Sequence, residues 1–455
     1  MTSMTEKPQI DSTFANMMVL ANGNAELSLE GLNTILSKTI CEDYETKMIL
    51  FLLLLLTYTD KEQRNAILKG ETTIGKTYNM TEVLWFFPED DIIEIAGASP
   101  KSFVHEGSAV LVDSRDMTPI DFADKPRPKT KNFEGDPKEK WDKWYEKLRY
   151  GAYYLNFANK ILVFLDMPDT RLLKNLRPLL SHDRKRCNYH IVEKKKGLRT
   201  KKVIIEGFMT FLFATAYTDL QKQDASRNFQ LSPTDNPMKI KKAIDLLAQK
   251  KTDSSYEEWY RTDVDRMGLK MRIGNIQSLG IKNIFFEKED MEDLKDWFNE
   301  KTENLSPKVM RDFPRLYALA EAWALLNWKH RKIVDDNIYC NKTDIEVAKS
   351  LYEPILTCNE LGLSPDEYEV FKILEPQCDV TIGLSIQEIH NLYYQEKKRT
   401  CSDYRLRGML KNFCRAGLLR EEKEKGKLKY YSIKSEEEPQ PDSKSEVQQK
   451  LGEKQ

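Results

Sequence analysis

The chain has 455 residues, of which 40% are apolar and 31% are charged, a composition typical of a globular protein with a charged surface. Lys and Arg number 71 and Asp and Glu number 72, so a net charge of −1 excludes binding of nucleic acid or membrane through overall charge. Any contact with nucleic acid or membrane must therefore come from a local basic cluster. The length of the chain is enough for roughly two to four domains.

The cysteines and the first residues indicate the compartment. Seven cysteines are scattered along the chain, with no C-x-x-C pair and no zinc-site spacing, as expected of reduced thiols. The segment MTSMTEKPQIDST lacks the basic and apolar regions of a signal peptide. We therefore expect a cytoplasmic protein without a membrane partner.

The first predicted elements are helices. Residues 1–28 are polar and are expected to be a flexible N-terminus, whereas 29–57 predict helices that end in the apolar run MILFLLLLL. At ~1.5 Å per residue this run is much shorter than the ~30 Å hydrocarbon core of a bilayer. We interpret it as a buried helix.

A glycine loop follows at residues 70–77, GETTIGKT, and matches the pattern G-x-x-x-x-G-K-[ST]. Such a loop curls so that its backbone N–H groups face phosphate oxygens, and the next helix adds its positive end. Lys76 supplies a charge to the outer phosphates and the Thr77 hydroxyl can hold Mg²⁺, which predicts a site for ATP and Mg²⁺. The predicted binding residues are Gly70, Glu71, Thr72, Thr73, Ile74, Gly75, Lys76 and Thr77.

A second strand supplies the acid that a nucleotide site needs. Asp91–Ala96 predicts a short strand, and the apolar run ILVFL at 161–165 predicts a buried parallel strand that ends at Asp166. Met167 stands where ATPases of this type usually have a second acid. Either Asp166 holds the metal and another acid such as Asp169 activates water, or Asp166 itself activates water.

Two features surround this strand. The charged, proline-containing segment 115–147 predicts a surface insertion with one short helix. Alternating residues around EKKKGLRTKK predict a β-hairpin at 187–205, with Gly197 in its turn. His182, just before the hairpin, is interpreted as a capping or packing residue.

The tip of this hairpin is strongly basic. Its cationic residues are Lys194, Lys195, Lys196, Arg199, Lys201 and Lys202. Crowded on one tight loop, they suit contacts with DNA phosphates without sequence readout, although a charge run is often only a solvated surface.

The rest of the chain is mostly helical. After a buried strand at 210–215, segments with helical periodicity fill 237–350. Residues 362–433 combine two capping boxes, a third helix near 403–416 and a second hairpin, which together predict a winged helix. The tail 434–455 has almost no large apolar residues and is expected to be disordered.

The third helix of this small domain has two distinct faces. Leu406, Met409, Leu410 and Phe413 form an apolar stripe. The opposing basic face consists of Arg407, Lys411 and Arg415. A helix of this kind packs inward and can present cations to DNA phosphates, although winged helices also bind proteins.

The order of these parts resembles the AAA+ ATPases, and within them the ATPase core of the minichromosome-maintenance helicases. The resemblance covers about residues 35–350 and is closest to short archaeal or plasmid-type relatives without the N-terminal DNA-binding domain. Thr215 stands where the family has its first-sensor asparagine. ASRNF has the place of the family's Ser-Arg-Phe, which makes Arg227 the arginine finger. MRDFPRLYALAEA resembles the sensor helix, with Arg311 as its arginine.

The resemblance implies an α/β fold, with an AAA+ P-loop core of three layers at 29–236, a helical lid at 237–350 and a C-terminal winged helix. It further implies a homo-oligomeric ring, a hexamer in the family, that hydrolyses ATP and moves along DNA as a replicative helicase. Arg227 would act on the nucleotide of a neighbouring subunit. The implied catalytic residues are Lys76, Asp166, Thr215, Arg227 and Arg311.

Two other functions remain open. One is a nucleotide-switched DNA-binding protein of the origin-recognition or loader type, although a loader does not need a translocating hairpin. The other is a degenerate ATPase that only scaffolds an assembly, which the replacement of the second acid by Met167 favours.

Overall fold

The computed structural model describes residues 12–70, 72–95, 103–104, 109–121, 137–165, 167–193, 199–215, 228–234, 236–302, 309–398, 400–424 and 426–433. The chain divides into two compact units, Met1–Asp366 and Glu367–Gln455. The division lies close to residue 362, where the sequence predicts the start of a second domain.

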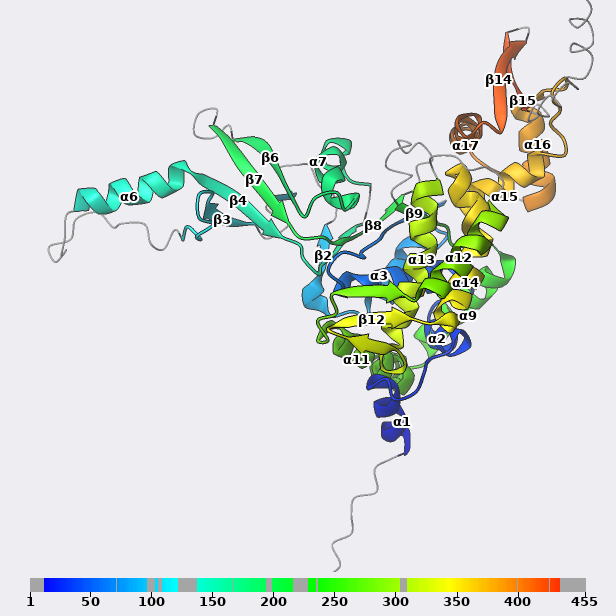
Figure 1. Cartoon of the computed structure of the whole chain (residues 1–455). Coiled ribbons are helices and arrows are strands. Elements are labelled where there is room, and N and C mark those ends of the chain that lie inside the picture. Colours follow the sequence, from blue (N-terminus) through cyan, green and yellow to red (C-terminus); the bar gives the residue numbers. More distant parts are fainter. Residues whose placement is uncertain are drawn as a thin grey trace, which may run out of the picture. The chain divides into compact units, whose positions relative to one another are not determined.

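A five-stranded parallel sheet forms the centre of the first unit, in the order β2-β5-β8-β1-β9 (Figure 1). Its strands are β1 (Asn65–Lys69), β2 (Ile92–Ile95), β5 (Ile161–Phe164), β8 (Thr210–Thr215) and β9 (Asn228–Leu231). The strands predicted at 91–96, 161–165 and 210–215 are confirmed. Because every pairing is parallel, all five carboxyl ends lie at one edge of the sheet.

Both faces of this sheet are covered. Ile161 and Val163 of β5 enter one hydrophobic core, and Leu162 and Phe164 enter another. Parallel sheets are usually buried on both faces, so their strands show no polar alternation. This explains why ILVFL is apolar throughout.

Helices fill the first core. α3 (Tyr44–Leu55) is apolar on every side, and Met48–Leu55 has no exposed surface. It packs against α4 (Lys76–Leu84) and α13 (Val309–Leu326). The prediction of a buried helix is confirmed, because a helix without a polar face must lie inside the protein. None of the described helices is long and apolar enough to cross a lipid bilayer.

The second core lies between the central sheet, helix α7 (Thr170–Leu180) and a four-stranded sheet of order β3-β4-β7-β6. The predicted hairpin is confirmed as β6 (Arg186–Glu193) and β7 (Arg199–Glu206). The tip residues 194–198 lie outside the described residues.

The predicted insertion at 115–147 lies between two strands that the sequence did not predict. α6 (Pro137–Arg149) follows β3 (Val110–Asp113) and precedes β4 (Gly151–Asn156). β3 and β4 pair with each other, and β4 pairs with β7. The helix predicted in 115–147 is therefore confirmed as α6, and the strands that flank the insertion extend the sheet of the hairpin.

The region predicted as a helical lid does not form a separate domain. Besides α13, the α-helices of this region are α9 (Pro237–Thr252), α10 (Tyr256–Thr262), α11 (Val264–Gln277), α12 (Lys288–Lys301) and α14 (Lys342–Leu361). It also contains a three-stranded sheet of β10 (Asn283–Phe286), β11 (Lys332–Val334) and β12 (Asn337–Cys340) that the sequence did not predict. α13 and α14 share the first core with the central sheet, so this region belongs to the same unit.

The expectation of a flexible N-terminus is wrong for the described part of that segment. α1 (Ser12–Ala21) packs along α11, followed by α2 (Leu29–Ser37). Arg272 of α11 donates to the carbonyl of Leu20 over 3.3 Å, and Asn275 donates to the carbonyl of Ala21 over 2.9 Å. These long-range bonds have no signature in the local sequence.

The second unit contains three helices and a small antiparallel sheet of order β13-β15-β14. Its elements are α15 (Pro365–Leu374), β13 (Leu384–Ser385), α16 (Ile386–Lys397), α17 (Asp403–Ala416), β14 (Leu419–Glu424) and β15 (Lys427–Ser432). One of the two predicted capping boxes is confirmed, with Ser385 and Glu388 bonded reciprocally.

Candidate nucleotide site

The glycine loop joins the central strand β1 to helix α4. Its backbone takes left-handed conformations at Gly70 (φ 140°), Thr73 (φ 78°) and Gly75 (φ 90°). A Cβ atom at Gly70 would lie 2.2 Å from Cδ1 of Ile74, so a larger residue would push the Ile74 side chain aside and would be strained at this φ. The loop is therefore tightly curled between Lys69 and the first residue of α4.

Lys76 lies inside this curl. Its ammonium donates to the carbonyl of Gly70 over 2.9 Å, and the residue is 9% exposed. Burial lowers the pKa of the Lys76 ammonium from its usual value. The adjacent Thr77 is exposed at the first turn of α4, where its hydroxyl is accessible to a metal ion.

A second lysine, which the sequence analysis missed, holds the loop from outside. Lys239 of α9 donates to the carbonyl of Ile74 over 2.8 Å and to that of Thr234 over 3.1 Å. Its ammonium also lies 2.5 Å from the carboxylate of Asp43, whose side chain is completely buried. Lys239 is far from the loop in sequence, so no motif could have revealed this contact.

Asp43 is the centre of this network. It precedes α3 in a left-handed conformation, and its carboxylate accepts bonds from Asn79 Nδ2 over 2.8 Å and from the Thr234 backbone over 2.6 Å. The segment after β9 is tied to the same place, because Ser232 Oγ donates to the carbonyl of Lys69 over 3.0 Å. The start of α3, the loop and the segment after β9 thus form one braced unit.

The strand order brings one more predicted residue, Thr215, to the edge of the sheet that carries the loop. Thr215 ends β8 and is paired in register with Lys69, directly beside the start of the loop. β8 separates β1 from β5, whose carboxyl end lies at the same edge. Asp166 follows β5 in sequence but lies outside the described residues, as does Glu71 of the loop.

Of the two residues predicted to hold Mg²⁺, the structure describes only Thr77. Among the residues that the structure describes, no group of three or more His, Cys, Asp or Glu side chains could hold a metal ion. Magnesium bound with a nucleotide needs fewer protein ligands, because phosphates and water supply most of its six oxygens. The hydroxyl of Thr77 is one such oxygen, and Asp166 remains the predicted second ligand.

Arg311 lies at the opposite edge of the sheet. It lines a cavity of about 290 Å³ together with Asn65 and Phe229, at the amino ends of β1 and β9. The other lining residues are Arg64, Leu180, Ser181, His182, Asp183, Met310, Pro314 and Arg315. The four residue steps of β1 place this edge about 13 Å from the start of the loop. Arg311 and Lys76 of one chain are therefore not adjacent.

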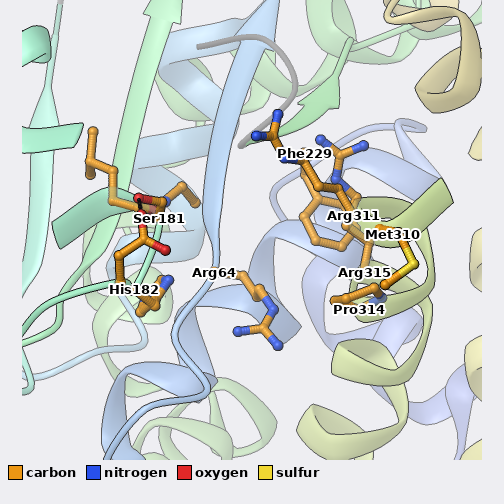
Figure 2. A pocket seen from close by; sticks show the side chains of 11 residues that line it. Arg64, Ser181, His182, Phe229, Met310, Arg311, Pro314 and Arg315 are labelled. Atoms are coloured by element: carbon orange, nitrogen blue, oxygen red, sulfur yellow. Dashed lines mark hydrogen bonds between the residues drawn. The ribbon is translucent and has the colours of Figure 1, made fainter. Parts of the chain in front are cut away.

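The cavity is rich in arginine (Figure 2). Arg64 lies between His182 and the start of α13, which carries Arg311 and Arg315. Arg315 is held in place by bonds to Asp312 over 2.6 Å and to the carbonyl of Asn228 over 2.8 Å. Arg227 precedes Asn228 directly in sequence and lies outside the described residues.

His182 borders the same cavity with a left-handed backbone (φ 56°) and packs on Phe208. Within the described part of the chain, its Nε2 has no hydrogen-bond partner. Burial, assisted by the Arg64 guanidinium, lowers the pKa of His182 to about 4. The ring is therefore neutral at pH 7.

The residues predicted to contact DNA are only partly described. Lys194, Lys195 and Lys196 lie outside the described residues. Arg199 pairs through its backbone with Glu193, and Lys202 with His190. The Lys201 ammonium lies 5.0 Å from the ring centroid of Tyr153 on β4. Arg199, Lys201 and Lys202 therefore lie on β7, the strand that follows the hairpin tip.

On α17 the two predicted faces are present. Leu406, Met409, Leu410 and Phe413 are buried, and the basic face of Arg407, Lys411 and Arg415 is exposed. Arg407 lies 3.5 Å from Asp403 one turn earlier. The basic face is therefore accessible to a polyanion.

A search against models of protein families finds no match to this chain, and no curated protein matches its sequence significantly. The structure is an α/β fold around a parallel five-stranded sheet, which is compatible with a P-loop fold.

Proposed function

We propose that this chain is an AAA+ ATPase that moves along DNA as a ring, resembling the replicative minichromosome-maintenance helicases. The observation that carries the proposal is the curled glycine loop between β1 and α4, with the Lys76 ammonium inside it. A tight loop, an enclosed lysine and a following helix N-terminus together suit a nucleotide polyphosphate.

The strand order supports hydrolysis as well as binding. Because β8 lies between β1 and β5, Thr215 stands between the lysine of the loop and the strand that leads to Asp166. A polar side chain at this place can orient water between the γ-phosphate and an acid. This order supports a shared site for Lys76, Thr215 and the acid that the sequence predicts after β5.

In the proposed reaction a water oxygen attacks the γ-phosphorus and the bond to the β-phosphate oxygen breaks, releasing ADP and phosphate. Lys76 stabilises charge on the outer phosphates, and Thr215 orients the water. Bound Mg²⁺, held by Thr77 and Asp166, would neutralise charge on the β- and γ-phosphates.

The position of Arg311 supports the ring. Arg311 lies at the amino edge of the sheet, and the sequence places Arg227 next to the same edge. Arginines there can act on a nucleotide only if it is bound to a neighbouring copy. In this proposal each ATP site is completed by the next subunit.

DNA as substrate is supported by the basic hairpin and by the exposed basic face of α17. Binding at either place would not depend on the base sequence, because the cations of the hairpin and of α17 are suited to contacts with DNA phosphates. A scaffold with little hydrolysis is the second candidate, favoured by the Met167-Pro168 sequence after Asp166.

The test is DNA-stimulated ATPase and strand unwinding by the wild type, Lys76→Ala and Lys195/Lys196→Ala. We expect Lys76→Ala to lower hydrolysis by about 10²-fold or more, because the main phosphate charge is lost. The hairpin variant should keep basal hydrolysis and lose unwinding. Lys282/Lys329→Ala, which removes two exposed lysines elsewhere, is the matched control.

Three outcomes distinguish the candidates. ATP binding without turnover by the wild type favours the scaffold. Turnover and DNA binding without unwinding favour the nucleotide-switched DNA-binding protein. Unwinding that survives the hairpin substitutions contradicts the role given to the hairpin.

A further inference from the structure

The arginine-rich cavity at the amino edge of the central sheet has the character of an anion pocket. Its volume of about 290 Å³ is at the lower end of the range for small-molecule sites, about 300–1,000 Å³. Among the lining residues that the structure describes, Arg64, Arg311 and Arg315 are cationic and Asp183 is the single acid. The charge of the lining favours an anionic ligand, and the volume favours a small one.

Arg64 is placed to hold such a ligand. Its side chain is 17% exposed and lies between His182 and the start of α13 (Figure 2). Its guanidinium donates to the carbonyl of Gln63 over 3.0 Å, and the carboxylate of Glu62 lies 3.6 Å away. The second distance is too long for a normal hydrogen bond. A guanidinium has five N–H donors in a planar fork, so Arg64 retains donors for an oxyanion.

The start of α13 forms the wall beside Arg64. Arg315 is buried there, held by Asp312 over 2.6 Å and by the carbonyl of Asn228 over 2.8 Å. Because Asp312 offsets its charge, Arg315 gives the cavity a rigid wall more than a free cation. Met310 and Arg311, in the first turn of this 18-residue helix, also line the cavity. The positive end of the helix dipole therefore adds to the charge of the arginines.

His182 lies across the cavity from α13 and brings a buried nitrogen to its lining. Within the described part of the chain, Nε2 of His182 has no hydrogen-bond partner. Buried polar atoms are nearly always hydrogen-bonded, and the exceptions often have a functional role. A neutral imidazole can carry its proton on Nε2 and donate it to an oxyanion. The adjacent Asp183 carboxylate accepts from Ser181 Oγ over 2.5 Å.

We infer that this cavity binds the phosphate dianion of a small molecule, with Arg64 and His182 donating hydrogen bonds to its oxygens. The amino end of α13 stabilises the same charge. The site lies within one chain, about 13 Å from the start of the glycine loop, so it requires neither a neighbouring copy nor ATP. The inference goes beyond the proposed ATPase and does not depend on it.

The test is isothermal titration calorimetry of the full-length chain with inorganic phosphate at constant ionic strength. Every sample carries Lys76→Ala, so that phosphate held by the glycine loop does not mask the cavity. We expect one phosphate per chain, with an affinity that is independent of protein concentration. Arg64→Met should weaken binding by about tenfold or more, because a charge-assisted hydrogen bond is lost. Arg171→Met, at the exposed far end of α7, is the matched control and should leave the affinity unchanged.

Asp183→Asn gives a second measurement that does not depend on the folding of Arg64→Met. Asp183 is exposed, and an asparagine there can still accept the hydrogen bond from Ser181. Removing this like charge should tighten phosphate binding by about two- to fivefold. Unchanged affinity in a folded Arg64→Met variant would overturn the inference. If that variant does not fold, unchanged affinity in Asp183→Asn would overturn it.

Oligonucleotides with a 5′-phosphate or a 5′-hydroxyl identify the carrier of the phosphate. We expect the chain to bind both equally, because the cavity is sized for a small molecule. A preference for the 5′-phosphate that Arg64→Met abolishes would assign the site to the end of a nucleic-acid chain and overturn the inference.

ATP affinity of the chain with Lys76 intact separates this inference from the proposed function. If that chain binds ATP while the Lys76→Ala chain binds no phosphate, the cavity site is refuted and the nucleotide site stands. If phosphate binding depends on Arg64 but ATP does not bind, the proposed function is refuted and the cavity site stands.

Discussion

Replacing Lys239 with Met tests whether this lysine braces the nucleotide loop. The substitution keeps the length of the side chain but removes the ammonium that contacts the Ile74 and Thr234 carbonyls and the Asp43 carboxylate. Breaking a buried ion pair costs about 3–5 kcal/mol. Asp43 keeps its bonds from Asn79 and the Thr234 backbone, so we expect the lower limit of about 3 kcal/mol in the unfolding free energy.

The same change should weaken ATP binding about tenfold, because the curled loop loses an external hydrogen bond to a charged donor, worth about 1.5 kcal/mol or more. Urea unfolding measures the stability, and titration with a fluorescent ATP analogue measures the affinity. Lys239→Arg should recover part of both, and Lys241→Met, on an exposed neighbouring position, should change neither. Wild-type ATP affinity in a folded Lys239→Met variant would refute the bracing role.

Three further changes follow from particular contacts. Gly70→Ala should weaken ATP binding by about tenfold or more with little loss of helical CD signal, because a side chain at this φ strains the loop and pushes on Ile74. In His182→Asn, the new Asn residue tolerates the left-handed backbone. Between pH 7 and pH 5 the unfolding free energy of this variant, measured in urea, should fall by about 2 kcal/mol less than that of the wild type. The sign follows because the unfolded chain protonates His182 near its usual pKa of about 6.5, whereas the folded pKa is about 4, so acid favours unfolding. An equal pH dependence in both proteins would contradict this. Replacing Arg407, Lys411 and Arg415 of α17 with Ala should leave the domain folded but make the slope of log K for DNA binding against log salt shallower, by the equivalent of about three phosphate contacts. An unchanged slope would contradict a DNA contact at this face.

Much of the fold could be predicted because the signals are local. The loop pattern, the apolar runs and the alternation on either side of Gly197 depend on residues close in sequence, and the structure confirms the strands, the buried α3 and the hairpin. The segments β3 and β4 escaped prediction, because they are short and gain their partners only in the four-stranded sheet. Asp166, Arg227 and the lysines at the hairpin tip remain predictions.

The sequence by itself determined the chemistry available to this protein: a glycine loop that ends in Lys76 and Thr77, and two clusters of cationic residues. Backbone freedom at Gly70 and Gly75 and helical or strand periodicity are local properties, so they are visible without a fold. Only the tertiary structure decided what those groups meet. It brought Lys239 to the loop and placed Arg311 at the other edge of the sheet. It also left Ile240, Ile244 and Leu247 of α9 exposed. The sequence could not show these outcomes, because strand order and helix packing depend on contacts between residues far apart in the chain.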